Sequence, residues 1–220
     1  MFKSQKNAFW QALIVALIMF NIGIFFGYML ERNRVQKIDV LYATSELEML
    51  DVKAINSLIS LSNLNCKSAI QENLAFANKI YDEAKLLDRY EVASRISDAL
   101  ILRHKKYDLL RIQLWINSIM IKEKCNSSLH NVVYLYEYGS GEIAIEQKAK
   151  QSAFSRFLGE LKEKHGDSIL LIPIAGDIDF GSIKMLRENY NITILPAVLI
   201  DEKFKIESID ELKDIEKYVK

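Results

Sequence analysis

The chain has 220 residues and a formal net charge of zero, because 29 basic side chains balance 29 acidic ones. This balance argues against a nucleic-acid-binding surface, which is usually strongly basic. The two cysteines do not suffice for a zinc site, which usually takes four cysteine or histidine ligands. His104, His130 and His165 show no spacing of a metal site or a catalytic triad, so we expect them to lie exposed or at helix ends. No pattern indicates a cofactor.

The first long apolar segment, residues 8–30, carries no charged side chain and follows a short basic tail, residues 1–7. Roughly 20 apolar residues suffice to cross a bilayer, so this segment predicts a transmembrane helix. A cleaved signal peptide is the alternative, but its apolar stretch is shorter and is followed by small residues at the cleavage site. Here the segment ends in large residues, Tyr28-Met29-Leu30, which favours a retained single-span anchor.

Small residues gather on one side of this predicted membrane helix. At about 100° per residue, Ala12, Ala16, Gly23 and Gly27 fall together, and the two glycines form a GxxxG pair. Such residues let two helices approach closely, which indicates a seam for a homodimer. The alternative is that glycine and alanine are simply common in membrane helices. Asn21 points away from this seam and needs a polar partner or a bend in the helix.

Residues 28–138 contain no glycine and no proline, the strongest breakers of regular structure. We therefore predict long helices over residues 31–126, arranged as an antiparallel helical bundle or a coiled-coil stalk. The first covers about residues 38–61, the second begins with a capping box at Ser68, and the third runs to about Lys124. The third helix is apolar nearly all round, so we expect it to be buried on several sides.

The two cysteines bracket the second and third of these helices. Cys66 precedes one and Cys125 ends the other, so antiparallel packing brings both to the same end of the hairpin. Spacing alone does not show that the sulfurs meet. A structural disulfide is our main expectation; two free thiols and a redox-active pair are the alternatives. Basic residues on the two sides of the membrane span nearly balance, so the expected disulfide decides the topology and indicates an extracytoplasmic C-terminal domain.

Strands and helices alternate in the last ninety residues. Apolar and β-branched runs predict strands, the helical spacing of apolar residues predicts helices, and Ser208 with Glu211 forms a capping box. The predicted strands cover residues 132–136, 168–175, a segment beginning near Pro196, and 204–206; the predicted helices cover residues 142–164, 179–190 and 209–219.

This βαβαββα order, together with the segment from Tyr190 to Ile200, resembles the thioredoxin-like superfamily over residues 130–220. The resemblance implies an α/β fold with a four-stranded mixed sheet of order 2-1-3-4 and a cis peptide bond before Pro196. It places the second strand at an edge, which suits Pro173 because proline cannot donate to a strand ladder. The reactive loop of that family corresponds here to Tyr138-Gly139-Ser140-Gly141.

No cysteine lies in this loop, whereas a thioredoxin-type oxidoreductase needs a reactive thiolate and a second cysteine. The resemblance therefore favours a redox-inactive binding or scaffold module that engages a peptide or protein partner, and argues against an enzyme. The residues expected to line its groove are Tyr138, Gly139, Ser140, Gly141, Leu195 and Pro196.

Two other functions remain open at this stage. One is a membrane-bound thiol–disulfide oxidoreductase that uses Cys66 and Cys125, although Cys125 leads into the end of the first strand that lies about 20 Å from the loop. The other is a purely structural protein, in which the anchor and stalk form an oligomer and the terminal domain is an inert cap.

Overall fold

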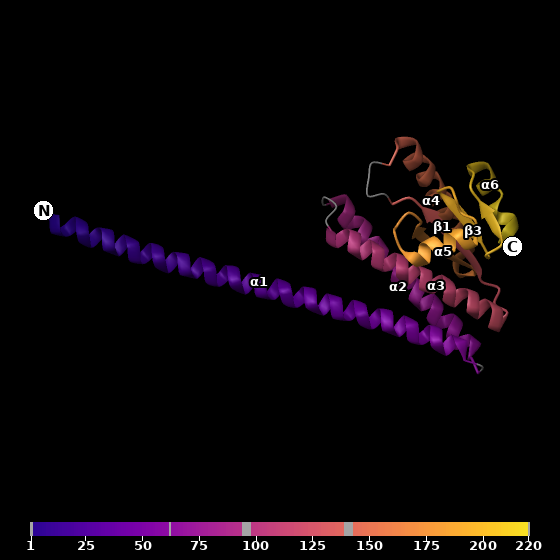
Figure 1. Ribbon diagram of the computed structural model, residues 1–220, viewed down its shortest axis with the longest axis horizontal. Helices are drawn as coiled ribbons and strands as arrows, with labels where there is room; N and C mark the ends of the chain where they lie inside the picture. The colour runs from indigo at the N-terminus through magenta and orange to yellow at the C-terminus, as the bar shows by residue number, and fades with distance from the viewer. Residues whose placement is uncertain (1, 62, 94–97, 139–142, 220) are drawn as a thin grey trace. The chain divides into compact units, whose positions relative to one another are not determined.

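The computed structural model describes residues 2–61, 63–93, 98–138 and 143–219; for residues 2–8, 11–12, 30–46, 48, 83–93, 98–100 and 103 it describes the backbone alone (Figure 1). The chain divides into two compact units, Met1–Asp51 and Val52–Lys220, and each is described by itself. Helix α1, Phe2–Ser60, contributes residues to both units.

Within the described residues, the unit Met1–Asp51 contains helix α1 alone. The helix begins at Phe2, so the predicted basic tail is itself helical. Among the residues whose side chains the structure describes, no helix is both long enough and apolar enough to cross a membrane. The predicted span, residues 8–30, includes four residues whose side chains lie outside the described set: Ala8, Gln11, Ala12 and Leu30. The transmembrane helix therefore stays a prediction.

Two long helices follow in the second unit, α2 at Cys66–Ala93 and α3 at Asp98–Cys125, and they pack against each other. Residues 94–97, between the two helices, lie outside the described residues. Helix α2 begins earlier than predicted, because the Asn65 side chain accepts a hydrogen bond from the Ser68 N–H at 3.2 Å. Asn65, and not Ser68, therefore caps the helix.

The last turns of α1 meet this hairpin where α2 begins and α3 ends. Ile59, Ala69 and Ile121 are buried together there. The Nζ atom of Lys124 donates to the carbonyl of Ile59 at 2.8 Å and to that of Leu61 at 3.0 Å. Carbonyl groups at a helix C-terminus lack partners within the helix and attract cations, so Lys124 stabilises the end of α1.

A four-stranded mixed sheet forms the centre of the second unit, with the strand order β2-β1-β3-β4. Strands β1 and β2 are parallel, and the other two pairs are antiparallel. The strands are β1 at His130–Tyr136, β2 at Ile169–Ala175, β3 at Ala197–Ile200 and β4 at Phe204–Ile206. The predicted α/β class and strand order are confirmed, with Pro173 on the edge strand β2, and the arrangement is consistent with a thioredoxin-like core.

Helices and short turns connect these strands. They are α4 at Ile145–His165, η1 at Gly166–Ser168, α5 at Gly181–Asn189, α6 at Ile209–Lys213 and η2 at Ile215–Tyr218. The predicted cap of the last helix is confirmed, because the Ser208 side chain accepts a hydrogen bond from the Glu211 N–H at 3.3 Å. The helix itself is shorter than predicted and continues as the 3-10 turn η2.

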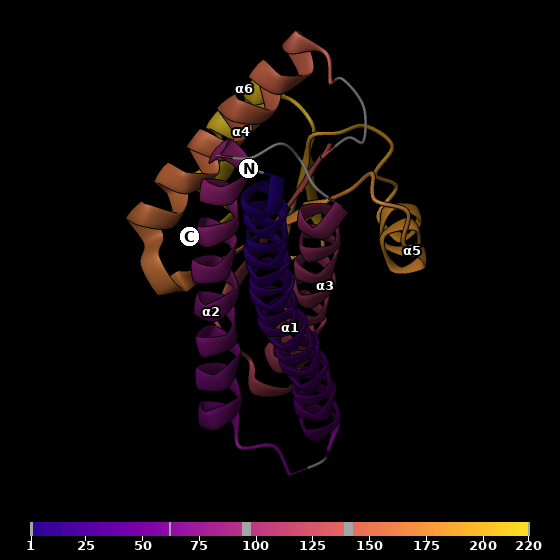
Figure 2. The same ribbon diagram turned by 90° about the vertical axis from the view of Figure 1, so that its left-hand side faces the viewer.

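The two faces of the sheet are covered by different helices. Alternate residues of β1, such as Val132 and Tyr134, pack on one face with Phe154 and Leu158 of α4 and Leu212 of α6. Helix α3 instead contacts strands β1 and β2, and Figure 2 shows α5 on the opposite side of the sheet from α4 and α6. The predicted burial of α3 is confirmed by Leu110, Ile112, Leu114, Trp115 and Ile121, all of which are buried.

Gly159 lies within helix α4, and a Cβ atom added there meets nothing within 4 Å. Glycine inside a helix costs about 0.5–1 kcal/mol relative to alanine, so we expect Gly159→Ala to raise the free energy of unfolding by about that amount. Urea unfolding followed by circular dichroism measures the change. Gly166→Ala is the control, because Gly166 has a φ of +55° and an alanine there is strained. If Gly159→Ala lowers the free energy of unfolding, the space beside Gly159 is not open.

Candidate binding site

The predicted groove lies at the end of the sheet where β1 and β2 finish. Tyr138, Leu195 and Pro196 are described there, whereas Gly139, Ser140 and Gly141 lie outside the described residues. The Leu195–Pro196 peptide bond is cis. Pro196 is buried and Leu195 is half-buried, so the structure places these two residues in the body of the domain.

The Leu195–Pro196 segment is fixed from two sides. Gln147, in the first turn of α4, donates from Nε2 to the Leu195 carbonyl at 2.8 Å. On the other side, the Leu195 side chain packs against the backbone of Gly176, where an added Cβ would lie 3.0 Å from Leu195 Cδ2. A larger residue at position 176 would require the end of the Leu195 side chain to shift, so close approach favours glycine there.

Arg187 of α5 holds the residues that lead into this segment. Its guanidinium donates to three backbone carbonyls, those of Ile192 at 3.1 Å, Gly176 at 3.0 Å and Thr193 at 3.2 Å. The planar guanidinium presents several donors in a fixed geometry, which a lysine side chain does not. One side chain therefore ties the loop after β2 to the loop before Pro196.

Tyr138 is held by both its backbone and its ring. Its N–H donates to Asp177 Oδ1 at 2.8 Å. Its ring stacks on the imidazole of His104, with ring centroids 3.6 Å apart and an interplanar angle of 24°. Helix α3 therefore contributes directly to the candidate groove through His104, a contribution that the sequence analysis does not anticipate.

His104 belongs to a buried polar network that joins α3 to the sheet. Its Nδ1 lies 3.0 Å from Asp108 Oδ2, and its Nε2 lies 3.1 Å from the hydroxyl of Tyr136. Asp108 is fully buried, and its Oδ1 accepts hydrogen bonds from Arg111 Nη1 and from the Ala175 N–H, both at 3.2 Å. The expectation that His104 is merely exposed or at a helix end is wrong; an i, i+4 pair with Asp108 on one helix face was the available signal.

The network keeps the Tyr136 phenol protonated. Burial raises its pKa well above the ordinary value, and the nearby Asp108 carboxylate raises it further, while the Arg111 guanidinium acts in the opposite direction. A protonated phenol donates a hydrogen bond but is not a nucleophile. The Tyr136 phenol therefore serves as a hydrogen-bonding group that positions its neighbours at this end of the sheet.

The opposite end of the sheet is joined to α3 by a second network. The turn between β3 and β4 has positive φ at both central residues, 47° at Asp201 and 59° at Glu202, as in a type I′ turn. Asp201 accepts from Lys122 at 2.5 Å and lies 2.7 Å from His130 Nδ1, while Glu202 accepts from Trp115 Nε1 at 2.6 Å. These bonds hold non-glycine residues in a conformation that usually needs asparagine or glycine.

The charge on Asp201 is stabilised by these neighbours. Burial alone pushes its pKa upward, but hydrogen bonds from Lys122, His130 and the Asn131 amide outweigh that effect and lower the pKa. His130 lies against the Asp201 carboxylate and is only partly exposed, so the prediction that it is exposed or at a helix end is wrong, whereas His165 is the last residue of α4, at a helix end as predicted.

The two cysteines lie far from the candidate groove. Cys66 and Cys125 form a disulfide, with their Cα atoms 5.5 Å apart, so the predicted bond is confirmed. Cys125 lies about 30 Å from His104 along α3, at about 1.5 Å per residue. The disulfide and the candidate groove are therefore separate sites on the domain.

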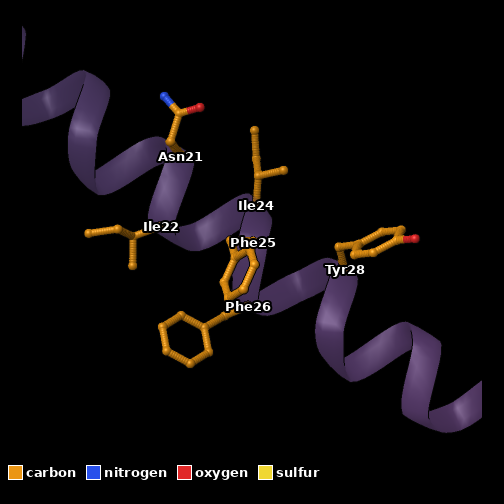
Figure 3. Close-up of a pocket in the computed structure, with 6 residues that line it drawn as sticks. All are labelled: Asn21, Ile22, Ile24, Phe25, Phe26 and Tyr28. Atoms are coloured by element: carbon orange, nitrogen blue, oxygen red, sulfur yellow. The ribbon is translucent and has the colours of Figure 1, made fainter.

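The predicted small-residue seam is only partly described. A Cβ atom added at Gly23 or Gly27 meets nothing within 4 Å, and Ala12 lies outside the described side chains, so the seam stays a prediction. The partner of Asn21 is now defined, because its Nδ2 donates to the Leu17 carbonyl of the same helix at 2.7 Å. The hollow that includes Asn21 is formed by side chains of this one helix, as Figure 3 shows, and does not form an enclosed site.

Comparison with known proteins adds no assignment. No protein-family model, no curated protein and no solved structure matches this chain.

Proposed function

We propose that the chain is a membrane-anchored, redox-inactive member of the thioredoxin-like superfamily, whose C-terminal domain holds a peptide or protein segment beside Tyr138, Leu195 and Pro196. The strand order of the sheet and the position of Pro196 at the start of β3 support the superfamily assignment. The absence of any cysteine from the candidate groove supports the loss of thiol exchange.

The observation that carries this proposal is the fixing of the segment before Pro196. Arg187 and Gln147 together bind three residues of that segment, Ile192, Thr193 and Leu195, through their backbone carbonyls. Binding a flexible chain costs less free energy when the receptor is already ordered. A rigid backbone at this end of the sheet suits recognition of an extended segment.

The N-terminal helix supplies the proposed anchor. Residues 8–30 have the length and composition to cross a bilayer. Asn21 bonds to Leu17 within its own helix, which satisfies a polar group that would otherwise lack a partner in lipid. The Cys66–Cys125 disulfide supports the proposal that the C-terminal domain lies in an oxidising compartment, outside the cytoplasm. Association of two such anchors through Gly23 and Gly27 remains part of the proposal.

Site-specific photocrosslinking tests the binding function. A photoreactive residue at Ile194, which is 55% exposed, is compared in intact membranes with the same residue at Leu58, which is 59% exposed near the disulfide. We expect a discrete crosslinked product from position 194 only, and its loss in the Tyr138→Ala, Leu195→Ala double variant. Thermal melts of that variant establish that it is folded. A product that persists in a folded double variant would contradict the proposed groove.

A further inference from the structure

His104 contacts both the candidate groove and a buried carboxylate through one ring. Its imidazole stacks on the Tyr138 ring, with centroids 3.6 Å apart, while its Nδ1 lies 3.0 Å from Asp108 Oδ2 and its Nε2 lies 3.1 Å from the Tyr136 hydroxyl. The His104 side chain is 13% exposed and that of Asp108 is 0% exposed. A change at either nitrogen of this ring therefore acts directly on a residue of the groove.

The neighbours of His104 fix which nitrogen carries the proton of the neutral ring. Asp108 Oδ1 accepts from Arg111 and from the Ala175 N–H, and an ionised carboxylate can only accept hydrogen bonds, so Nδ1 donates to Oδ2. Nε2 of the neutral imidazole is then an acceptor, and the protonated Tyr136 phenol donates to it. Both nitrogens have partners in this state, and the ring is held against Tyr138.

A second proton on His104 disturbs this arrangement at Nε2. The new N–H points at the Tyr136 oxygen, which keeps its own proton because burial raises the pKa of that phenol. Arg111 also donates to this oxygen, so three donor hydrogens compete around it. Asp108 attracts the charged ring at Nδ1, whereas Tyr136 and Arg111 oppose the new proton at Nε2. The conflict is relieved when the ring turns about its bond to Asp108 and carries Nε2 towards solvent, away from Tyr136 and Tyr138.

Histidine is the side chain whose ordinary titration falls between about pH 5 and 8. We propose that His104 is a pH-dependent latch, in which the neutral ring holds Tyr138 in the candidate groove and protonation of His104 releases the Tyr138 ring. The role of the groove rests on the proposed function, whereas the latch itself can be tested without a bound partner.

Other charged and titratable groups belong to the elements packed around the latch. They are Lys105, Lys106 and Tyr107 beside it on α3, Glu137 after β1, Asp177 after β2, and Lys85, Asp88 and Arg89 in the second half of α2, which packs against α3. Of these, Asp177 bonds the backbone N–H of Tyr138 and holds the chain there independently of the ring. Release by His104 therefore frees the Tyr138 side chain and leaves its backbone in place.

Fluorine NMR of the full chain in detergent micelles tests the latch. 3-Fluorotyrosine is placed at position 138 and, as a control, at position 218, because Tyr218 packs on the ring of Phe204, which does not titrate, with centroids 4.5 Å apart. We expect the resonance at position 138 to change in one step as the pH falls from about 7.5 to about 5, together with the imidazole resonances of His104. The resonance at position 218 should stay constant.

Exposure of the label separates release from protonation in place. A soluble paramagnetic agent should relax the fluorine at position 138 more strongly below the step than above it. In His104→Gln, which cannot take up a proton, both the resonance and its relaxation should be independent of pH; thermal melts establish that this variant is folded. The native chain decides the result by itself if the variant does not fold. A constant resonance at position 138, or a step without increased relaxation, would overturn the latch.

Photocrosslinking from position 194 connects the latch to binding. We expect the yield of the crosslinked product to fall about threefold or more between about pH 7.5 and pH 5.5 in the native chain and to stay constant in His104→Gln. A fluorine step with no crosslinked product at either pH would contradict the proposed function and leave the latch standing. A product whose yield does not change across the step would show that the latch does not control the groove.

Discussion

We expect Asp108→Asn to lower the free energy of unfolding by about 3–5 kcal/mol, the largest loss from a single substitution in the polar networks of the domain. Asp108 is fully buried, and its carboxylate receives hydrogen bonds from Arg111 and from the Ala175 N–H and lies 3.0 Å from His104. Asparagine keeps the shape of the side chain but removes the charge that compensates the buried guanidinium of Arg111. Urea unfolding of the full chain in detergent measures the loss.

A double-mutant cycle identifies the cause of this loss. If the uncompensated guanidinium is the main cost, Asp108→Asn combined with Arg111→Met should destabilise less than the sum of the two single changes. Asp179→Asn serves as the control, because Asp179 is exposed and its change should stay within about 0.5 kcal/mol. Strict additivity of the two network variants would show that Asp108 and Arg111 do not interact as described.

Much of the fold was predictable because local patterns and tertiary constraints agree. Strand β4 was predicted with its observed bounds. The resemblance implied the edge position of β2, and Pro173 agrees with it because a proline in a central strand would remove a ladder hydrogen bond. The disulfide was predictable because an antiparallel hairpin brings Cys66 and Cys125 together. Proline restricts the position of a strand in a sheet, and a cysteine pair restricts the packing of two helices.

The role of α3 was less accessible to sequence reasoning. The helix is apolar nearly all round, which predicts burial but not the neighbour that covers it. Hydrogen bonds from its polar residues determine which part of the sheet it contacts. Asp108 accepts from the Ala175 N–H at the end of β2, and Trp115 and Lys122 donate to the turn after β3. Such contacts join residues more than sixty positions apart, so the local periodicity of the sequence does not indicate them.

The turn between β3 and β4 was equally difficult to predict from the sequence. Hairpins with positive φ at two positions usually carry Asn-Gly or a similar pair, and Asp201-Glu202 does not match. The free-energy cost of that conformation is offset by hydrogen bonds from the side chains of α3. The sequence of the turn alone therefore does not predict it. The candidate groove is similar, because its residues were proposed from resemblance, while the supports that fix it, Arg187 and Gln147, were not anticipated.

Removing the disulfide should produce a loss of comparable size by a different mechanism. The Cys66–Cys125 bond closes a loop with a sequence separation of 59 residues. Such a cross-link reduces the entropy of the unfolded chain by an amount worth about 4 kcal/mol in the loop-closure model. We expect the Cys66→Ser, Cys125→Ser variant to lose about that much free energy of unfolding, measured by urea unfolding without reductant.

Reductant separates the cross-link from the change of side chain. The native chain should lose stability when a strong thiol reductant is added, whereas the double serine variant, which has no other cysteine, should not respond. The junction should nevertheless stay folded, because Lys124 still binds the carbonyls of Ile59 and Leu61 and the apolar cluster beside them is intact. A native chain whose stability is unchanged by complete reduction would show that packing alone holds the hairpin.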